Sequence, residues 1–189
     1  MPASEMTAAV ETEIEGLRVF EPRVFEDERG AFMEVYHAER YALDGLTERF
    51  VQDNLSRSRR GVVRGLHFQR RHPQGKLIQV VRGKVYDVAV DLRAGSPTFG
   101  QHFGIELSDA NHRQVWVPPG FAHGFCVLSD WADVLYKCTD VYHPGDEGGL
   151  RWNDPALGIE WPVADPVLSE KDQHHPPLAA LGPDDLPCV

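Results

Sequence analysis

Short strand-like runs, separated by turn residues, follow one another along most of this chain, and they restrict the fold more than any other feature. Seven runs carry the pattern: LRVFEPRVFED, RGAFMEVYH, GVVRGLHFQ, KLIQVVRGKVYDVAVDLR, QHFGIELS, RQVWVPPGFAHGFCVLS and DVLYKCTDVY. Segments rich in Gly, Pro, Asp and Asn lie between them, as in DERG, PQGK and HPGDEGG. Only AERYALDGL and PVLSEKD favour helix. Many short strands with so little helix predict an all-β sandwich or barrel.

The alternation within KVYDVAVDL predicts a strand with two different faces. One face carries two carboxylates and the other is apolar, because successive side chains point to opposite sides of a strand. A barrel with a polar lining on one face provides a pocket for a small molecule. The first face holds Val85, Asp87, Ala89 and Asp91, and the second holds Tyr86, Val88, Val90 and Leu92.

The length of 189 residues suits one domain, and no interdomain linker or repeat interrupts it. The first dozen residues are small and polar, so we expect a flexible extension over residues 1–15 and a single domain over residues 16–189. The net charge of −10 argues against a nucleic acid as partner. A few convergent arginines could still bind a phosphorylated small molecule.

Three cysteines without CxxC spacing favour a reducing compartment and argue against a disulfide scaffold or a structural zinc site. No apolar run approaches the roughly 18 residues that a membrane span requires. The start of the chain lacks the basic and apolar regions of a signal peptide. We therefore expect a cytoplasmic protein with no membrane contact.

Within GVVRGLHFQ, Arg64 and His67 interrupt an apolar run. Their odd separation places them on opposite faces of a regular strand, although Gly65 permits a bulge that turns one of them. His67 alone fits a surface histidine as well as a functional one. Lys76 alone fits a solvated lysine at the start of a strand.

Three further segments carry polar residues with two interpretations each. In PPGFAHGF, His123 follows a rigid turn and fits a hairpin corner as well as a site. Tyr136 and Tyr142 share a face of a regular strand, where tyrosines commonly belong to the core or its rim. The segment from Ser169 to Asp172 reads alone as a helix N-cap followed by acidic residues.

Together these segments resemble the dTDP-4-dehydrorhamnose 3,5-epimerase family, sugar-nucleotide epimerases of the cupin superfamily. The resemblance covers residues 20–172. It implies a cupin-type jelly-roll β-sandwich or barrel with short C-terminal helices. The motifs that carry it are DERGAFMEVY, FVQDNLSRS, VVRGLHFQ, GKLIQVVRGKVYDVAVDLRAGSPTFG, VPPGFAHGF, YKCTDVY and WNDPALGIEWP with LSEKD.

The metal motif of cupins is only half present. His123 keeps the spacing of the second motif with Pro118 and Gly120, but Phe68 and Gln69 follow His67 where a metal cupin has a second histidine. Lys76 occupies the place of the motif's glutamate, and an ammonium repels a cation instead of binding it. We expect no metal and no cofactor.

The resemblance implies epimerisation of dTDP-4-keto-6-deoxy-glucose at C3 and C5, giving dTDP-4-keto-rhamnose through an enolate. His67 would be the base, and Asp172 would orient its imidazole and stabilise its protonated form. Lys76 would face the C4 oxygen. Tyr136 would return a proton from the opposite face.

The resemblance also implies a set of nucleotide-binding residues. Arg29 and Arg64 would bind the pyrophosphate, because a guanidinium matches phosphate oxygens. Gln52 and Asn54 would contact the edges of the thymine.

The base itself would be held between aromatic rings. Tyr142 would stack on it, with Phe32 as a second apolar wall. Family members are homodimers that exchange an N-terminal strand, so residues of DERGAFMEV could serve the partner's site. Four further positions would line the site: Glu34, His123, Glu147 and Lys171.

Three alternatives remain open. The first is an enzyme that epimerises C3 alone, since it would share the same four catalytic residues. Phe121 and His143 are positions that could separate the two types. The second is a non-catalytic sugar-nucleotide-binding cupin. The third is a metal-dependent oxygenase or isomerase, against which Lys76 argues.

Overall fold

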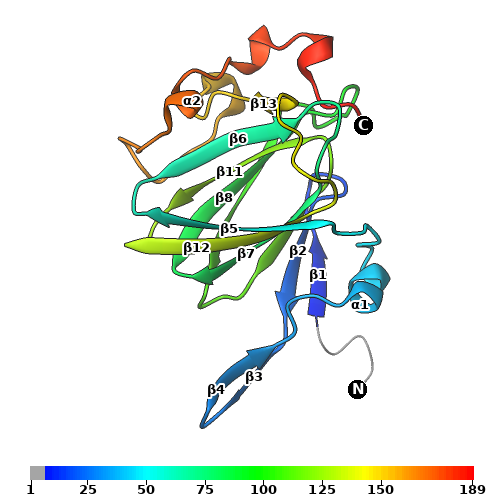
Figure 1. Ribbon diagram of the computed structural model, residues 1–189, viewed down its shortest axis with the longest axis vertical. Coiled ribbons are helices and arrows are strands. Elements are labelled where there is room, and N and C mark those ends of the chain that lie inside the picture. Colours follow the sequence, from blue (N-terminus) through cyan, green and yellow to red (C-terminus); the bar gives the residue numbers. More distant parts are fainter. Residues whose placement is uncertain (1–6) are drawn as a thin grey trace.

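Two antiparallel sheets face each other in a β-sandwich (Figure 1). The computed structural model describes residues 7–189. The six-stranded sheet runs β1 (Thr7–Glu11), β2 (Arg18–Pro22), β10 (Gln114–Val117), β7 (Lys76–Arg82), β12 (Trp131–Cys138), β5 (Gln52–Arg59). The five-stranded sheet runs β13 (Glu147–Gly149), β6 (Val63–Gln69), β11 (Phe121–Val127), β8 (Lys84–Asp91), β9 (His102–Ser108). The predicted all-β jelly-roll architecture is confirmed.

The remaining elements lie outside the sandwich. Strands β3 (Val24–Asp27) and β4 (Gly30–Met33) form a hairpin that projects from the body of the molecule (Figure 1). Helix α1 (Ala38–Leu43) follows it, and α2 (Glu170–Gln173) lies in the C-terminal segment. No helix among residues 7–189 is long and apolar enough to cross a membrane. Single 3-10 turns span Pro155–Leu157, Leu178–Ala180 and Pro183–Asp185.

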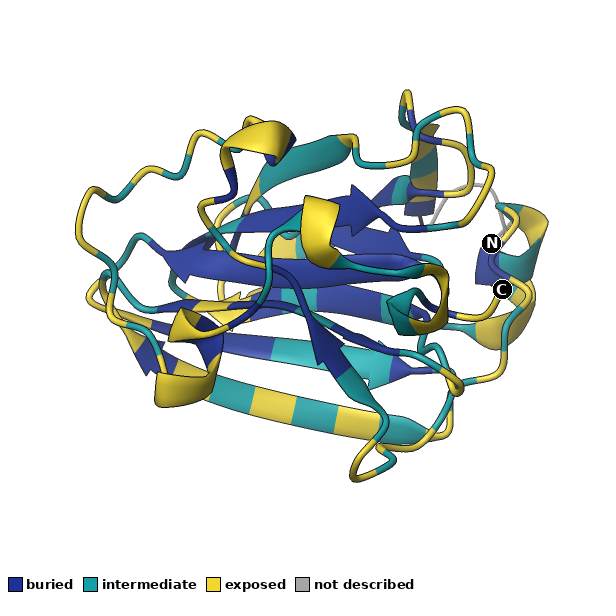
Figure 2. Ribbon diagram, turned by 90° about the horizontal axis from the view of Figure 1, so that it is seen from above, coloured by how far each residue is buried: buried dark blue, intermediate teal, exposed yellow. Residues whose placement is uncertain are grey.

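Both faces of the five-stranded sheet are covered. Between the sheets, side chains such as Val85, Phe125 and Val134 form one core. On the other face, Val88 packs with Leu150 and their neighbours beneath the C-terminal segment. Strands β8 and β11 are therefore buried along most of their length (Figure 2).

The segment expected to be a flexible extension, residues 1–15, contains strand β1 within the described part of the chain. Residues 1–6 lie outside the described part of the chain. Strand β1 pairs with β2 from Thr7 opposite Pro22 to Glu11 opposite Arg18. Ile14 is buried in the core between the sheets, which anchors the segment after the strand. The flexibility expected for residues 1–15 and the domain boundary at residue 16 both stay predictions.

A bulge in β6 places Arg64 and His67 on the same face of the strand. In the pairing with β11, His67 lies opposite His123 and Arg64 lies opposite Phe125. Three steps along β6 thus match two steps along β11, so one extra residue is inserted in β6. Since His123 and Phe125 share a face, Arg64 and His67 share it too. The bulge that Gly65 permits is therefore present.

Gly65 is required at this bulge for two reasons. Its φ of +119° is a conformation that side chains disfavour. A Cβ at this position would also lie 2.6 Å from Gly124 Cα and 2.7 Å from the His123 carbonyl oxygen, which are backbone atoms of the paired strand. The two strands cannot make room without losing their register.

We expect Gly65→Ala to lower the free energy of unfolding by roughly 2–4 kcal/mol, because it adds a backbone clash to an unfavourable φ. The matched control is Gly95→Ala. Gly95 also has a positive φ, of +78°, but a Cβ there meets nothing within 4 Å. The control should lose only about 1–2 kcal/mol. Urea denaturation of both variants measures the difference, and equal losses would contradict this account of the bulge.

Candidate active site

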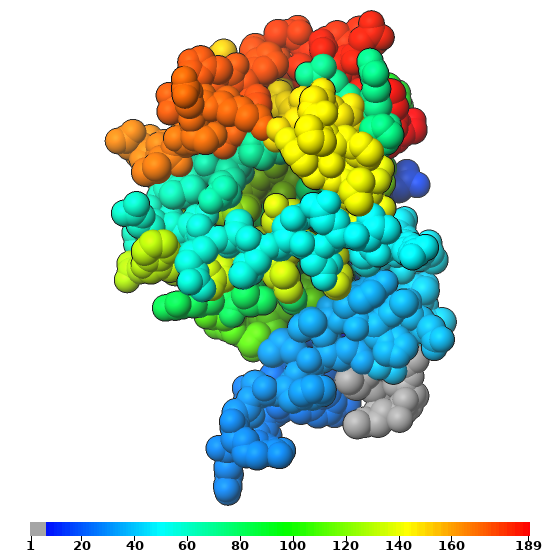
Figure 3. Space-filling model, viewed as in Figure 1, coloured from blue at the N-terminus to red at the C-terminus, as the bar shows by residue number. Residues whose placement is uncertain are grey.

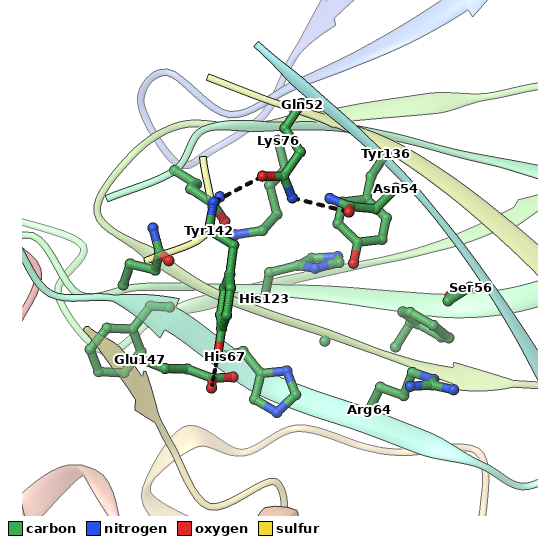
Figure 4. Close-up of a pocket in the computed structure, with 15 residues that line it drawn as sticks. Gln52, Asn54, Ser56, Arg64, His67, Lys76, His123, Tyr136, Tyr142 and Glu147 are labelled. Atoms are coloured by element: carbon green, nitrogen blue, oxygen red, sulfur yellow. Dashed lines mark hydrogen bonds between the residues drawn. The ribbon is translucent and has the colours of Figure 1, made fainter. Parts of the chain in front are cut away.

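A cavity of about 250 Å³ opens between the two sheets, with walls from both. Its mouth lies between β5, cyan, and β6, teal, in the space-filling view (Figure 3). The polar residues that line it are Gln52, Asn54, Ser56, Arg64, His67, Gln69, Gln74, Lys76, His123, Tyr136, Tyr142 and Glu147 (Figure 4). Nine of the fourteen predicted site residues are among them, and Asp172 and Lys171 lie directly behind.

His67 is held by Asp172, which lies 105 positions later in the chain. The C-terminal segment reaches β6 through a bridge between Val62 and Val167, and α2 begins shortly after it. The Asp172 amide donates to Ser169 Oγ (3.1 Å), which caps the helix and fixes the position of the aspartate. His67 Nε2 and Asp172 Oδ1 are hydrogen-bonded at 2.6 Å.

Asp172 remains an anion in this environment. Burial alone raises the pKa of its carboxyl, but the neighbouring His175 and His67 side chains and the Ser169 cap outweigh burial and lower the pKa. Only 4% of its side chain is exposed. A buried carboxylate held in this way stabilises a positive charge on the neighbouring imidazole. His67 can therefore accept a proton through Nδ1, its other ring nitrogen.

Lys76 and Tyr136 come from the opposite sheet, on the neighbouring strands β7 and β12. Desolvation lowers the pKa of the Lys76 ammonium, while Cys138 and Glu147 act in the opposite direction. Desolvation raises the pKa of the Tyr136 phenol, as does Cys138, and Arg64 opposes this. The phenol therefore stays protonated at neutral pH and can donate a proton.

A second histidine–aspartate pair lies deeper in the sandwich. His123 Nε2 lies 2.9 Å from Asp87 Oδ2 and 3.0 Å from Oδ1, and both residues are buried. Asp87 is one of the two carboxylates predicted to share a face of its strand. The other, Asp91, accepts hydrogen bonds from Arg93, Ser96 and Thr98 and does not line the cavity.

One end of the cavity carries a hydrogen-bonded chain of side chains. Gln52 Nε2 donates to Asn54 Oδ1 (3.0 Å), and Gln52 Oε1 accepts from the Tyr142 amide (2.9 Å). The Tyr142 hydroxyl donates to Glu147 Oε2 (3.3 Å), and Lys171 forms an ion pair with Glu147. Tyr142 is half exposed at the mouth, where a flat ligand could stack on its ring.

Arg64 lies at the other end of the cavity. Its Nε donates to Ser58 Oγ at 2.8 Å, which orients the guanidinium on the exposed side of β6. The bulge brings this guanidinium to the same face as His67.

Arg29, Phe32 and Glu34 do not reach the cavity of their own chain. Arg29 is paired with Asp27 on the exposed hairpin. Phe32 lies on the same hairpin with 69% of the residue exposed. Glu34 accepts from Arg40 Nε at 2.7 Å. Within one chain these three predicted residues therefore belong to a separate surface.

Two lining residues that the sequence analysis did not name could have been found by counting alternate positions along their strands. Ser56 follows Gln52 and Asn54 on alternate positions of β5, and these three are less exposed than the residues between them. Gln69 lies two residues beyond His67 and is 3% exposed. It donates to the carbonyls of His72 and Val141, and accepts from the His143 amide, so it fixes the loop of Tyr142.

Among residues 7–189, two groups of histidine and aspartate side chains lie close enough together to bind one metal ion. In the first, His67, Asp172 and His175, an ion would have to replace the short hydrogen bond between His67 and Asp172. In the second, His72, Asp140 and His143, the two rings stack with centroids 3.8 Å apart and would have to separate before both could bind one ion. The expectation that no metal takes part stays a prediction.

The lowered pKa of Asp172 predicts a pH dependence of stability. A carboxyl whose pKa is lowered by folding stabilises the fold above its unfolded pKa of about 3.9, and this contribution is lost as the pH falls. Asp172→Asn removes the charge. We expect the difference in free energy of unfolding between the wild type and Asp172→Asn to be largest above pH 5 and to shrink toward pH 3. A difference independent of pH would contradict the assignment of Asp172 as a stabilising anion.

Comparisons with known proteins identify the family of this chain. A family model for dTDP-4-dehydrorhamnose 3,5-epimerase matches residues 11–180. The protein of that name from Methanothermobacter thermautotrophicus is 52% identical over 172 residues, covering 89% of this chain and 93% of that protein. A dTDP-4-dehydrorhamnose 3-epimerase from Streptomyces niveus is 46% identical over 162 residues, covering 85% of this chain and 78% of that protein.

A solved structure shows the same fold throughout. It is the dTDP-6-deoxy-D-glucose-3,5-epimerase of Legionella pneumophila in complex with dTDP-4-keto-L-rhamnose. It has a TM-score of 0.93 and 51% sequence identity, and the match covers 97% of this chain and 98% of that one. The chain therefore belongs to the dTDP-4-dehydrorhamnose 3,5-epimerase family.

Proposed function

We propose that this protein epimerises dTDP-4-keto-6-deoxy-glucose at C3 and C5 to dTDP-4-keto-rhamnose. One observation carries the proposal: a histidine braced by a buried carboxylate and a protonated tyrosine enter one cavity from opposite sheets. Inversion of a carbon centre needs a base on one side and an acid on the other. His67 and Tyr136 supply these two groups.

His67 removes the proton from the carbon next to the C4 ketone. Its Nε2 is engaged with Asp172, so Nδ1 is the nitrogen that accepts the proton. The Asp172 carboxylate stabilises the imidazolium that results. A positioned base contributes roughly 10²–10⁴-fold to the rate.

Lys76 stabilises the enolate that forms at the C4 oxygen. Its ammonium lies in the cavity, where desolvation strengthens its interaction with a developing negative charge. One such donor is worth roughly 10²–10³-fold in kcat. Tyr136 then protonates the carbon from the other side.

The nucleotide occupies the mouth of the cavity in this proposal. Arg64 binds the pyrophosphate, Gln52 and Asn54 contact the thymine, and Tyr142 stacks on it. The dTDP-sugar bound in the Legionella pneumophila relative supports this class of ligand. His123 and Glu147 also line the cavity, and Lys171 holds Glu147 through its ion pair.

We also propose a homodimer in which the β3–β4 hairpin enters the partner's cavity. The hairpin projects from the sandwich, and Phe32 on it is 69% exposed and so available to a second subunit (Figure 1). Arg29 and Phe32 would then reach the nucleotide in trans. The three unpaired cysteines, Cys126, Cys138 and Cys188, support a cytoplasmic location.

Incubation with dTDP-4-keto-6-deoxy-glucose in D₂O tests the activity. NMR and mass spectrometry should show deuterium at both C3 and C5 of the product. Deuterium at C3 alone would favour the C3-only enzyme, the activity named for the Streptomyces niveus relative. No exchange at either carbon would reject the enolate mechanism and favour a non-catalytic binding protein.

Two substitutions separate the base from the acid in the same experiment. We expect His67→Ala to abolish exchange. We expect Tyr136→Phe to keep exchange while the inverted product falls by roughly 10²–10⁴-fold, because abstraction survives without the opposite acid. His174→Ala is the control, since His174 is exposed and lies outside the cavity. Exchange that survives in His67→Ala would show that another group is the base.

Subunit mixing tests the exchange of hairpins. His67→Ala and Arg29→Ala should each be nearly inactive alone. A mixed dimer restores one complete site if Arg29 acts in trans, because that site combines His67 of one subunit with Arg29 of the other. Recovery of up to about a quarter of wild-type activity after random mixing supports the trans arrangement. No recovery in confirmed mixed dimers would place Arg29 in its own subunit's site or outside any site.

A further inference from the structure

A third ionisable side chain, His175, lies behind the pair of His67 and Asp172. His175 Nε2 is 3.4 Å from Asp172 Oδ1, the same oxygen that holds His67. This nitrogen is buried without a hydrogen bond in the described structure. The ring therefore directs an unsatisfied polar atom at the carboxylate.

The position of this ring is restricted by its neighbours. The His175 side chain is 10% exposed. A Cβ on Gly149 would lie within 2.1–2.3 Å of three ring atoms, so β13 provides a surface shaped to the imidazole. The rings of His67 and His175 meet edge to face with centroids 5.6 Å apart. Because Nε2 already lies 3.4 Å from Asp172 Oδ1, a small rotation of the ring is enough to align a hydrogen bond between them.

We propose that His175 is a positioning residue of the epimerase: it donates a hydrogen bond from Nε2 to Asp172 Oδ1 and thereby limits how strongly Asp172 holds a proton on His67. The inference rests on the proposed role of His67 as the base. It assigns a use to a histidine that does not itself line the cavity.

The proton on His175 follows from the charges around it. A lone pair on Nε2 would face a buried carboxylate oxygen at 3.4 Å, which is unfavourable, so Nε2 carries the hydrogen. A second positive ring next to a protonated His67 is also unfavourable in this buried site.

The consequence for His67 has a definite sign. A carboxylate that accepts a second hydrogen bond has less negative charge to offer the imidazolium of His67. The bond from His175 therefore keeps more of His67 in its neutral form at neutral pH, which is the form that accepts a proton. Without that bond, His67 should remain protonated to a higher pH.

Other charged groups near His67 are common to the wild type and the variants proposed below. They are His123 on β11, Glu147 on β13, and Lys171 on α2, which pairs with Glu147. Their effect cancels when the variants differ only at position 175. The comparison therefore isolates the hydrogen bond of His175.

An NMR titration of the histidines in the full chain tests the proposal without substrate. We expect the midpoint of His67 to rise by roughly 0.5–1 pH unit in His175→Phe, which keeps a flat ring but removes the donor. His175→Gln keeps an N–H donor and should restore most of the wild-type midpoint. His174→Phe changes the exposed neighbour and should leave it unchanged. The acidic limb of kcat/KM should move in the same direction as the midpoint.

An unchanged midpoint in folded His175→Phe would overturn the proposal and leave His175 as a packing residue. A fall in kcat/KM that is equal at all pH values in both His175 variants would also overturn the proposal. If His175→Phe does not fold, the NMR titration of the wild-type protein tests the proposal instead. The proposal requires that Nε2 of His175 carries a proton throughout the titration of His67. A bare Nε2 would contradict the proposal. If the wild-type protein showed no epimerase activity, the proposed function would be rejected, but the NMR result on His175 would remain valid.

Discussion

The bulge that matches three steps along β6 with two steps along β11 is the constraint on which the site depends. In a regular strand, Arg64 and His67 would face opposite sides, and one of them would be lost beneath the C-terminal segment. The extra residue turns both into the cavity. Gly65 makes this possible, because any side chain would strike the backbone of β11. A local irregularity in one strand therefore brings together Arg64, the proposed phosphate contact, and His67, the proposed base.

The second requirement is control of charge in a space with little water. Asp172 is kept anionic by its hydrogen bonds, Tyr136 is kept protonated by burial, and desolvation lowers the pKa of Lys76, which enters from the opposite sheet. These three effects come from different parts of the chain, joined by the sandwich. The C-terminal segment does more than cover a sheet, since it carries the carboxylate that orients His67.

Much of the fold follows from the alternation of side chains in the sequence. The all-β sandwich and the polar inner face with Asp87 follow from strand periodicity. The same counting finds Ser56 and Gln69. It cannot decide the facing of Arg64, because a bulge depends on the pairing strand as well as on Gly65.

The remaining differences have physical causes of their own. Strand β1 pairs with β2, and Ile14 after it is buried in the core. These contacts involve distant residues, so the composition of the segment alone does not predict them. Arg29 matches a family motif, yet its distance from the cavity of its own chain depends on a projecting hairpin. His175 is visible in the sequence as part of HHPP, but only the end of α2 brings it behind Asp172.

The most direct test of the central claim is a crystal structure of the protein with dTDP-4-keto-L-rhamnose bound. The account predicts that C3 and C5 lie between His67 Nδ1 and Tyr136 Oη, within about 4 Å of each, with the C4 oxygen in hydrogen-bond distance of Lys76 Nζ. The pyrophosphate should contact Arg64. The account would be contradicted if C3 and C5 did not lie between His67 and Tyr136, or if the sugar lay outside the cavity.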